Sequence, residues 1–289
     1  PQVMIGQIQL LDLPDPERAR RALIDRAGEI LAAVDARQPR LLARGGGARR
    51  LEVRRFDHPL TGPMLAVDLH IDVCDAMGAN LVNSSVEAVA PRVEAIAGGR
   101  AALRILSNLA EERKVRAEGR VPLARLDLPR AGLDGAEVAS RIVEASAFAE
   151  VDPRRATTHN KGIMNGVDAF LLAVGQDWRA VEAGAHAWAA RSGRYGPLAT
   201  WRVEDGCLVG RLEMPMQVGT VGGTVGAHPV VDRLLALVGA EGAGQLGRIA
   251  AAVGLAQNLT ALRALATDGI QRGHMALHAR NVAVAAGAE

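Results

Sequence analysis

The clearest pattern in the sequence is a strict alternation between Leu65 and Val73. Apolar residues occupy every second position of this segment, and Asp68, His70 and Asp72 lie between them. A period of two residues is that of a β-strand, whose side chains point alternately to opposite faces of a sheet. The segment therefore predicts a strand with one face on a hydrophobic core and the other in contact with water.

Three further strands and two helical patterns surround this segment. The triplet Asp15-Pro16-Glu17 provides an N-cap, a proline at the first helical position and an acid in the first turn, and Asp75 is expected to cap the second helix. The order β-α-β-β-α-β is that of a split βαβ or ferredoxin-like domain, and it predicts one α+β domain over residues 1–108. The predicted elements are the strands Val3–Leu11, Leu51–Phe56, Leu65–Val73 and Ala101–Leu106, and the helices 15–38 and 75–98.

The pattern changes after Asn108 to helices and glycine-rich loops, which predicts a mostly helical larger domain over residues 109–289. The eight residues from Gly219 to Gly226 contain too many glycines for a regular helix, and they either cradle a ligand or pass close to a helix. The polar pair Gln257-Asn258 interrupts an apolar helical pattern and is expected to face water or a ligand. The predicted elements are helices at 135–150, 178–191 and 244–267 and a hairpin of 198–203 with 207–213.

Composition excludes several classes of protein. The chain has 289 residues, 49% of them hydrophobic, with a net charge of +2 and 2% aromatic residues. A nucleic-acid-binding protein needs a basic face and usually aromatic stacking groups, so no nucleic-acid partner is expected. Cys74 and Cys207 are too few for a disulfide framework, and no signal peptide or membrane span is visible, which favours the cytoplasm. The chain begins at Pro1 rather than methionine, and we expect it to be incomplete.

The segment Thr157–Arg179 contains the strongest candidate for chemistry. Lys161 lies in His-Asn-Lys-Gly and is followed by Asn165-Gly166, a combination typical of turns. A lysine presented in this way has two interpretations. It is an electrophile or Schiff-base former whose pKa is shifted and whose charge is held by a nearby carboxylate, or it is an ordinary solvated lysine. The residues leave both interpretations open.

Two segments of the first domain are candidates for binding an anion. Residues 75–80 open a helix directly after a strand, and the N-terminus of such a helix attracts negative charge, although the segment lacks the GxGxxG of a Rossmann turn. The loop 44–47 is glycine-rich and lies among arginines that suit a phosphate. A capped helix start and a solvated hairpin loop are the alternatives. His274 and His278 share a helix face, but no accompanying glutamate supports a metal site, so no metal is expected.

Five segments together resemble 3-hydroxy-3-methylglutaryl-coenzyme A reductases of the soluble bacterial class, and the similarity runs from about Gln7 to Gly287. The resemblance implies a four-electron reduction of the acyl-CoA thioester to mevalonate and CoA, or its reverse, with two nicotinamide cofactors used in turn. The segments are DAMGANLVNSSVEAVAP, VDPRRATTHNKGIMNGVDAF, GQDWRAVEAGAHA, LEMPMQVGTVGG and GLAQNLTALRALATDGIQRGHMALHARN.

The resemblance also implies a role for each matching residue. Lys161 would stabilise the developing oxyanion, Asp177 would hold the protonation state of that lysine, and His274 would protonate the departing CoA thiolate. His278 matches no catalytic position. The residues implied to bind the substrate carboxylate or to line its pocket are Arg155, Asn108, Asn165, Asn258 and Arg272.

The cofactor implied by the resemblance is NAD(H) or NADP(H). Gln38 stands where NADH-using relatives carry a ribose-binding acid, and Arg37 and Arg40 flank it, which favours a 2′-phosphate by charge, although the bacterial class mostly uses NADH. The residues implied to contact the dinucleotide are Asp75, Met77, Gly78, Asn80, Asn83, Gln38 and Arg40.

The resemblance further implies a homodimer or a larger homo-oligomer, with a site built across a subunit interface, and no membrane partner. The family's catalytic glutamate, which lies in a Glu-Glu-Pro-Ser-type segment, and its C-terminal flap have no counterpart in the 289 residues. Two alternatives to a reductase therefore stand: a catalytically incomplete fragment that binds CoA or a nucleotide, and an enzyme that forms a Schiff base at Lys161.

Overall fold

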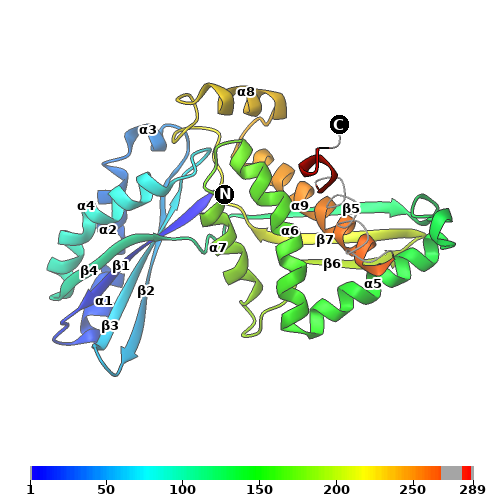
Figure 1. Cartoon of the computed structure of the whole chain (residues 1–289). Coiled ribbons are helices and arrows are strands. Elements are labelled where there is room, and N and C mark those ends of the chain that lie inside the picture. The colour runs from blue at the N-terminus through cyan, green and yellow to red at the C-terminus, as the bar shows by residue number, and fades with distance from the viewer. Residues whose placement is uncertain (1, 268–281, 288–289) are drawn as a thin grey trace. The chain divides into compact units, whose positions relative to one another are not determined.

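The computed structural model describes residues 2–267 and 282–287, which form two compact units (Figure 1). The first unit contains the described residues up to Val115 together with 171–185 and 215–247, and the second contains 116–170, 186–214 and the described residues from Arg248 onward. The predicted division at Asn108 lies near the first of these boundaries. A single division cannot assign residues 171–185 and 215–247 to the first unit, because the chain returns to that unit twice.

The first unit is built on a four-stranded sheet in the order β2-β3-β1-β4. Every neighbouring pair is antiparallel, with Ile8 opposite Val67 between β1 and β3. All four strands lie where the sequence patterns predicted them, and the chain is a mixture of helices and antiparallel sheets as expected. The strands are β1 (Val3–Leu11), β2 (Gly47–His58), β3 (Gly62–Asp72) and β4 (Arg100–Ser107).

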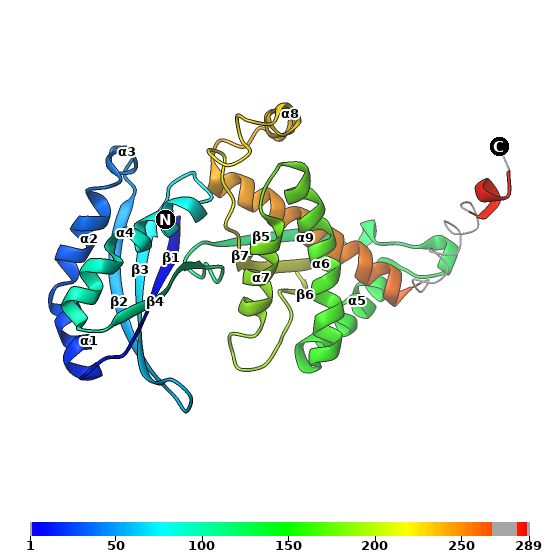
Figure 2. The ribbon, with the colours of Figure 1, turned by 60° about the vertical axis from the view of Figure 1, so that its left-hand side comes forward.

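Helices cover one face of this sheet (Figure 2). The Asp15 carboxylate caps the first helix by accepting the backbone N–H of Arg18 at 2.9 Å, as predicted. The prediction of one helix over 15–38 was wrong, because the backbone of Arg26 leaves the helical region at φ −103° and ψ 16° and a second helix restarts there. The helices are α1 (Pro16–Asp25), α2 (Ala27–Asp35), α3 (Pro39–Leu42) and α4 (Ala79–Ala97).

The other face of β3 is polar but not wet, which corrects the prediction from its alternating pattern. Asp68 is 3% exposed and His70 is 2% exposed. The Asp68 carboxylate accepts hydrogen bonds from Arg54 at 2.7 Å and Gln7 at 2.9 Å, and His70 Nδ1 lies 2.5 Å from Glu112 Oε1. Long neighbouring side chains therefore cover these polar groups and bind the Asp68 carboxylate and His70 Nδ1. A period of two residues alone cannot distinguish that arrangement from solvation.

The second unit contains a three-stranded sheet in the order β5-β7-β6, so it is less purely helical than predicted. The predicted hairpin is confirmed, with Ala199 opposite Leu212 in the antiparallel pair β6 and β7. The edge strand β5 was not predicted, because Val115 is its only buried residue and arginines and a glutamate lie between its small apolar residues. The strands are β5 (Lys114–Pro122), β6 (Ala199–Glu204) and β7 (Cys207–Pro215).

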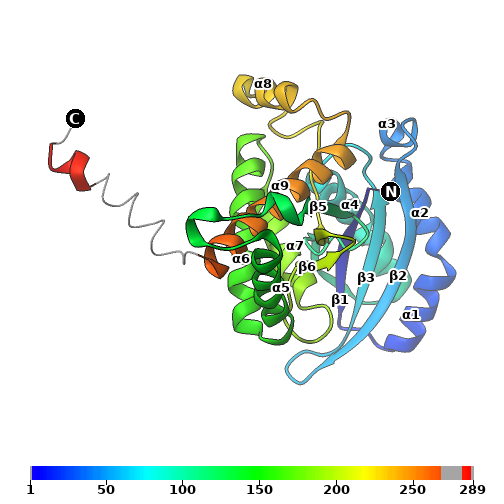
Figure 3. The same ribbon diagram turned by 90° about the vertical axis from the view of Figure 1, so that its right-hand side faces the viewer.

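Three long helices contact this sheet (Figure 3). Ser146 of α5 (Gly135–Val151) accepts the Trp201 N–H of β6 at 3.1 Å, and α6 (Pro153–Ala173) follows α5 directly. The third helix, α9 (Ala243–Ala266), is long and apolar enough to cross a membrane by length and composition. Its Gly254 packs closely on α6, where a Cβ would stand 2.7 Å from the Val167 side chain.

The remaining elements are shorter and include α7, which was predicted, and α8, which was not. Residues 216–228 between β7 and α8 contain no helix or strand, as the glycines predicted. These elements are the 3₁₀ turns η1 (Leu123–Arg125) and η2 (Pro129–Ala131) and the helices α7 (Trp178–Ala189) and α8 (Pro229–Val238).

Candidate functional site

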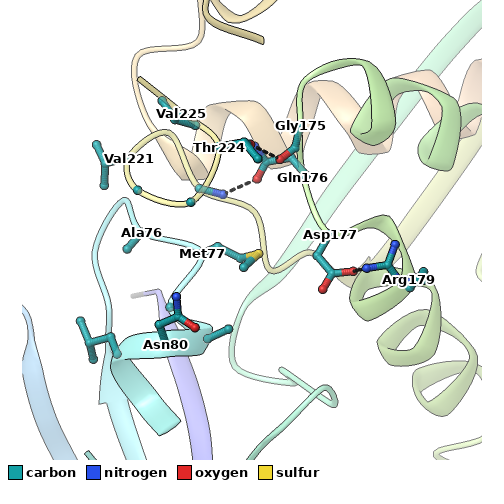
Figure 4. A pocket seen from close by; sticks show the side chains of 16 residues that line it. Ala76, Met77, Asn80, Gly175, Gln176, Asp177, Arg179, Val221, Thr224 and Val225 are labelled. Carbon is teal, nitrogen blue, oxygen red and sulfur yellow. Dashed lines mark hydrogen bonds and ion pairs between the residues drawn. The ribbon is translucent and has the colours of Figure 1, made fainter. Parts of the chain in front are cut away.

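A cavity of about 500 Å³ lies in the first unit, where three segments distant in the sequence meet (Figure 4). One segment is the start of α4, the second is the turn between α6 and α7, and the third is the glycine-rich loop before α8. Most of the lining groups are small, so the backbone forms much of the wall. The lining residues are 76–81, 175–177, Arg179, Gly219 and 221–225.

The first wall is the N-terminus of the 19-residue helix α4. Gly78 caps it with φ +99°, and a Cβ at this position would also stand 2.9 Å from the Val73 side chain, so only glycine fits. The helix therefore begins at Ala79, and the prediction that Asp75 caps it was wrong. The Asp75 carboxylate instead accepts the backbone N–H of Ala243 at 2.9 Å. The unpaired N–H groups of the first helical turn remain available to an anion at this wall.

The second wall is the loop that contains Gly219. A Cβ on Gly219 would stand 2.3 Å from the backbone nitrogen of Met77, and Val221 forms a parallel bridge with Ala76. The loop therefore lies directly against the residues that precede α4. Gly222 has φ +78° and open space where a Cβ would be, which leaves room for a ligand to approach the backbone.

The third wall is formed by residues 175–177, in the turn between α6 and α7. The side-chain oxygen of Gln176 accepts the Gly219 N–H at 2.8 Å, and its amide nitrogen donates to the Val174 carbonyl at 3.1 Å. The Thr224 hydroxyl donates to the Gly175 carbonyl at 2.8 Å. These bonds hold the glycine-rich loop against the turn.

Asp177 follows Gln176 and begins α7. Its carboxylate accepts the Ala180 N–H at 3.2 Å and lies 3.5 Å from the Arg179 guanidinium, with 37% of the side chain exposed. One oxygen therefore caps the helix. Lys161 belongs to the second unit, so the predicted pairing of Lys161 with Asp177 stays a prediction.

A smaller cavity of about 230 Å³ in the same unit brings together residues with three predicted roles. Asn108, Met77 and Asp177 all line it. Asn108 was predicted to bind the substrate, Met77 to bind the cofactor, and Asp177 to act in catalysis. Gln217 also lines it and was not predicted. Its amide nitrogen donates to the carbonyls of Asn108 at 3.0 Å and Ala180 at 2.7 Å, which fixes the start of α7 beside the end of β4.

Lys161 lies within α6, so the prediction of a turn at His-Asn-Lys-Gly was wrong. The two residues before it are buried and form hydrogen bonds with distant backbone groups. His159 Nε2 donates to the Ala199 carbonyl at 3.0 Å, while Asn160 donates to the Gly196 carbonyl at 2.9 Å and accepts the Leu198 N–H at 2.8 Å. These contacts attach residues 196–199 to α6, and they account for residues that look like turn formers in the sequence.

Lys161 itself is exposed on the surface of α6. It is one of only two lysines among the 34 lysines and arginines of the chain, and the other is Lys114. Lysine is a compact charge with a titratable amine, whereas arginine is a planar, permanently charged fork. The predicted catalytic role of Lys161 stays a prediction.

His159 is held neutral by its surroundings. The pKa of His159 is lowered to about 4, mainly by burial. The positive charge of Arg155 contributes to this shift, and the hydrogen bond to Ala199 opposes it. The imidazole is 1% exposed and has no partner at Nδ1 among the described residues. His159 is therefore a structural donor to β6 rather than an acid–base group.

The predicted substrate residues of the second unit have different surroundings. Arg155 lines a cavity of about 590 Å³, and partial burial lowers the pKa of its guanidinium. Asn165 is exposed one helical turn after Lys161, on the same face of α6. Asn258 is 1% exposed and accepts the Trp201 indole N–H at 2.8 Å, so this side chain does not face water.

The remaining predicted cofactor residues lie on α4 or near it. Asn80 is exposed at the cavity, whereas the Asn83 oxygen accepts the Leu106 N–H at 2.9 Å and joins α4 to β4. Gln38 precedes α3, with its amide nitrogen 3.5 Å from the Ser85 hydroxyl, and Arg40 is exposed.

Arg272 and His274 lie outside the described residues, so their predicted roles stay predictions. Sequence reasoning missed Arg113, Gln176 and Gln217, the polar side chains that hold the cavity walls. Their hydrogen-bond partners are mostly backbone groups of distant segments, which no local pattern indicates.

Comparison with known proteins places the site in a family. The family model for hydroxymethylglutaryl-coenzyme A reductase matches residues 1–279. The 3-hydroxy-3-methylglutaryl-coenzyme A reductase of Archaeoglobus fulgidus is 50% identical over 287 residues, which are 99% of this chain and 64% of that protein. A probable reductase of the same name from Borreliella burgdorferi is 36% identical over 262 residues, 91% of this chain and 60% of that protein. The chain thus spans less than two thirds of these curated relatives.

Solved structures give the same result. A 3-hydroxy-3-methylglutaryl-coenzyme A reductase from Streptococcus pneumoniae superposes with a TM-score of 0.87 at 42% identity, covering 99% of this chain and 68% of that one. A structure of the class II enzyme from the same organism, bound to NADPH in open conformations, has a TM-score of 0.85 at 42% identity and covers 91% of this chain and 71% of its own.

Proposed function

Because the chain belongs to the hydroxymethylglutaryl-coenzyme A reductase family, we propose that the intact protein interconverts 3-hydroxy-3-methylglutaryl-CoA with mevalonate and CoA, using NAD(P)H. The observation that carries the proposal is the cavity formed by the start of α4, the turn before α7 and the glycine-rich loop. An acyl-CoA reductase needs a site for a dinucleotide beside groups that act on a carbonyl, and Asp177 lines both this cavity and its smaller neighbour.

The cavity fits the pyrophosphate of a dinucleotide. Backbone N–H groups at the start of α4 face it, and the open space at Gly222 and Gly223 lets phosphate oxygens approach the main chain. Met77, Gly78 and Asn80 are the lining residues we assign to the cofactor. Asp75, Asn83, Gln38 and Arg40 remain in the proposed set, although the side chains of Asp75 and Asn83 already bind backbone groups elsewhere. The bound cofactor supplies a hydride.

NADPH is the cofactor that the charges favour. Gln38 carries no negative charge to repel a 2′-phosphate, and the exposed Arg37 and Arg40 on either side attract one. The class II relative from S. pneumoniae binds NADPH in one of its solved structures, which supports the same choice. NADH remains the alternative, and no metal is proposed.

In the proposed chemistry, each catalytic group either stabilises one charge or transfers one proton. When a hydride reaches the thioester carbon, negative charge develops on the oxygen, and the Lys161 ammonium meets it. Asp177 holds that ammonium in its protonated state. His274 then gives a proton to the CoA thiolate as the carbon–sulfur bond breaks, and a second hydride reduces the aldehyde to the alcohol of mevalonate.

The substrate's free carboxylate is assigned to arginines. Arg155 carries a partly buried guanidinium, which pairs more strongly with an anion than a fully solvated one would. Arg272, Asn108, Asn165 and Asn258 complete the proposed substrate set. Asn258 has only its amide nitrogen to offer, since its oxygen already holds Trp201.

We also propose the domain organisation implied by the family. The order β2-β3-β1-β4 with helices on one face supports a ferredoxin-like small domain over residues 1–108, with the larger domain over 109–289. A homodimer or larger homo-oligomer in the cytoplasm is the proposed form. The packing of α9 on α6 through Gly254 supports a location away from the membrane.

A spectrophotometric assay of the intact protein tests the function. We expect 3-hydroxy-3-methylglutaryl-CoA to trigger oxidation of NADPH or NADH, and mevalonate with CoA to trigger reduction of the oxidised cofactor. Binding of both ligands without turnover of either cofactor would instead indicate a non-enzymatic binding protein. Borohydride trapping of the substrate on Lys161 would favour Schiff-base chemistry.

A further inference from the structure

Arg113, between β4 and β5, joins two walls of the cavity from behind. Its guanidinium donates to the carbonyl of Met77 at 2.8 Å, to that of Ala76 at 3.0 Å, and to that of Val218. Its Nε donates to the Gln2 side chain at 2.5 Å. One planar group therefore binds both the residues that lead into α4 and the residue that leads into the glycine-rich loop.

The charge of Arg113 is unusual for its position. The side chain is 2% exposed and forms no ion pair among the described residues, and Asp72 and Asp75 act on it only at longer range. Burial lowers its pKa to about 10, so the guanidinium stays charged at neutral pH. A buried charge without a carboxylate partner is costly unless it is hydrogen-bonded, and carbonyl and amide oxygens here accept four of the five N–H donors of the guanidinium.

We propose that Arg113 is a positioning residue for the dinucleotide pyrophosphate: it fixes the start of α4 against the glycine-rich loop and places a positive charge behind both. The proposal rests on the proposed function of the cavity. A loop with Gly219, Gly222 and Gly223 has no side chains to hold its shape, so the spacing of its N–H groups depends on what anchors its ends. Arginine suits this position because its fork reaches several acceptors in one plane, which lysine does not.

Substitution of Arg113 in the full-length protein tests the proposal, because it should change the KM for NADPH much more than the KM for the acyl-CoA or kcat. For Arg113→Met we expect the KM for NADPH to rise about tenfold or more, with the KM for the acyl-CoA unchanged and kcat altered by less than about threefold. Arg113→Lys keeps the charge and should restore part of the cofactor affinity. Arg100→Met is the matched control, because Arg100 pairs with Asp12 at the exposed end of β4 and should change none of these constants.

Direct titration of NADPH fluorescence provides a readout that does not depend on turnover. The dissociation constant should weaken in the same order, Met more than Lys, while thermal unfolding shows a folded protein. An unchanged affinity in folded Arg113→Met, or an equal loss of affinity for NADPH and the acyl-CoA, would overturn the proposal, since a purely structural role moves every constant together.

A second variant keeps the proposal testable if Arg113→Met fails to fold. Gly219→Ala forces the same two segments apart, because its Cβ would meet the Met77 backbone at 2.3 Å, and it leaves Arg113 in place. We expect the same selective loss of NADPH affinity. Normal affinity in both Gly219→Ala and Arg113→Lys contradicts the proposal, whereas a wild-type protein that binds no dinucleotide contradicts the proposed function itself.

Discussion

Gln176 accepts the backbone N–H of Gly219 through its side-chain oxygen at 2.8 Å, and this bond joins the turn before α7 to the glycine-rich loop. The amide nitrogen of the same side chain donates to the Val174 carbonyl at 3.1 Å, and the residue is 9% exposed. A primary amide provides a donor and an acceptor in one plane, so no apolar or ionised side chain of similar size satisfies both backbone groups.

Gln176→Met should destabilise the protein and loosen the cavity. Removal of the amide leaves two buried backbone groups without partners, which costs about 1–3 kcal/mol of unfolding free energy. Urea denaturation at fixed pH measures this cost, and NADPH titration should show weaker binding. Gln9→Met is the control, because the one hydrogen bond of its side chain to the described residues is to the Met64 sulfur at 3.5 Å, and the substitution should change stability by less than about 0.5 kcal/mol. Equal stabilities of the two variants would rule out a structural role for Gln176.

The neutral state of His159 predicts a pH dependence of stability. The folded pKa is about 4, below the ordinary value near 6.5, so the unfolded chain binds the additional proton between these two values. The contribution of His159 to the free energy of unfolding is therefore fully present above about pH 6.5 and is lost as the pH falls toward about 4. The loss approaches about 3 kcal/mol, because one pKa unit corresponds to about 1.4 kcal/mol.

Denaturation curves of the wild type and His159→Gln at several pH values from about 7.5 down to about 4 measure this effect, because the unfolded chain takes up the additional proton in this interval. The variant should be less stable at neutral pH but should show a flatter dependence on pH. His58→Gln is the matched control, because His58 is exposed and should keep the wild-type slope. Parallel slopes for the wild type and His159→Gln would mean that His159 does not titrate on unfolding.

Replacement of Lys161 by arginine tests the proposed oxyanion partner most sharply. The variant keeps the positive charge but introduces a larger planar group, so kcat should fall by about a hundredfold or more. Stability should change by less than about 0.5 kcal/mol, because the side chain is exposed on α6. Lys114→Arg, at the other lysine of the chain, should leave kcat near the wild-type value. Full activity of Lys161→Arg would mean that the mechanism does not require the compact ammonium group of lysine at this position.

Elements with a local origin could be predicted from the sequence. The four predicted strand segments, of which Leu65–Val73 alternates most strictly, correspond to β1 to β4, and Asp15-Pro16-Glu17 lies at the start of α1. Alternation and helix capping depend on residues only a few positions apart. β5 could not be predicted in this way. Its single buried residue, Val115, leaves no apolar face, and its place in the sheet depends on pairing with β7.

The candidate site could be predicted only in part, because long-range contacts decide its geometry. His159 and Asn160 resemble turn residues by type, but backbone groups 36 to 40 positions away satisfy them and they lie in a helix. The strand–helix junction in the sequence placed Gly78 and Asn80 near the N-terminus of a helix, where the structure has them. The glycine-rich loop around Gly219 joins them through bonds to distant residues, which no pattern in one segment reveals.

Cofactor choice should depend on the charge at Gln38. Gln38→Asp places a carboxylate where a 2′-phosphate would lie and offers an acceptor to a ribose hydroxyl, so the ratio of kcat/KM for NADPH to that for NADH should fall by about tenfold or more. Gln38→Asn is the matched control, since asparagine has the same length as aspartate without the charge and should retain most of the wild-type ratio. Both ratios come from initial rates with each cofactor at saturating acyl-CoA. If Gln38→Asp shifts the ratio no more than Gln38→Asn does, Gln38 does not contact the ribose, because only the charge distinguishes the two variants.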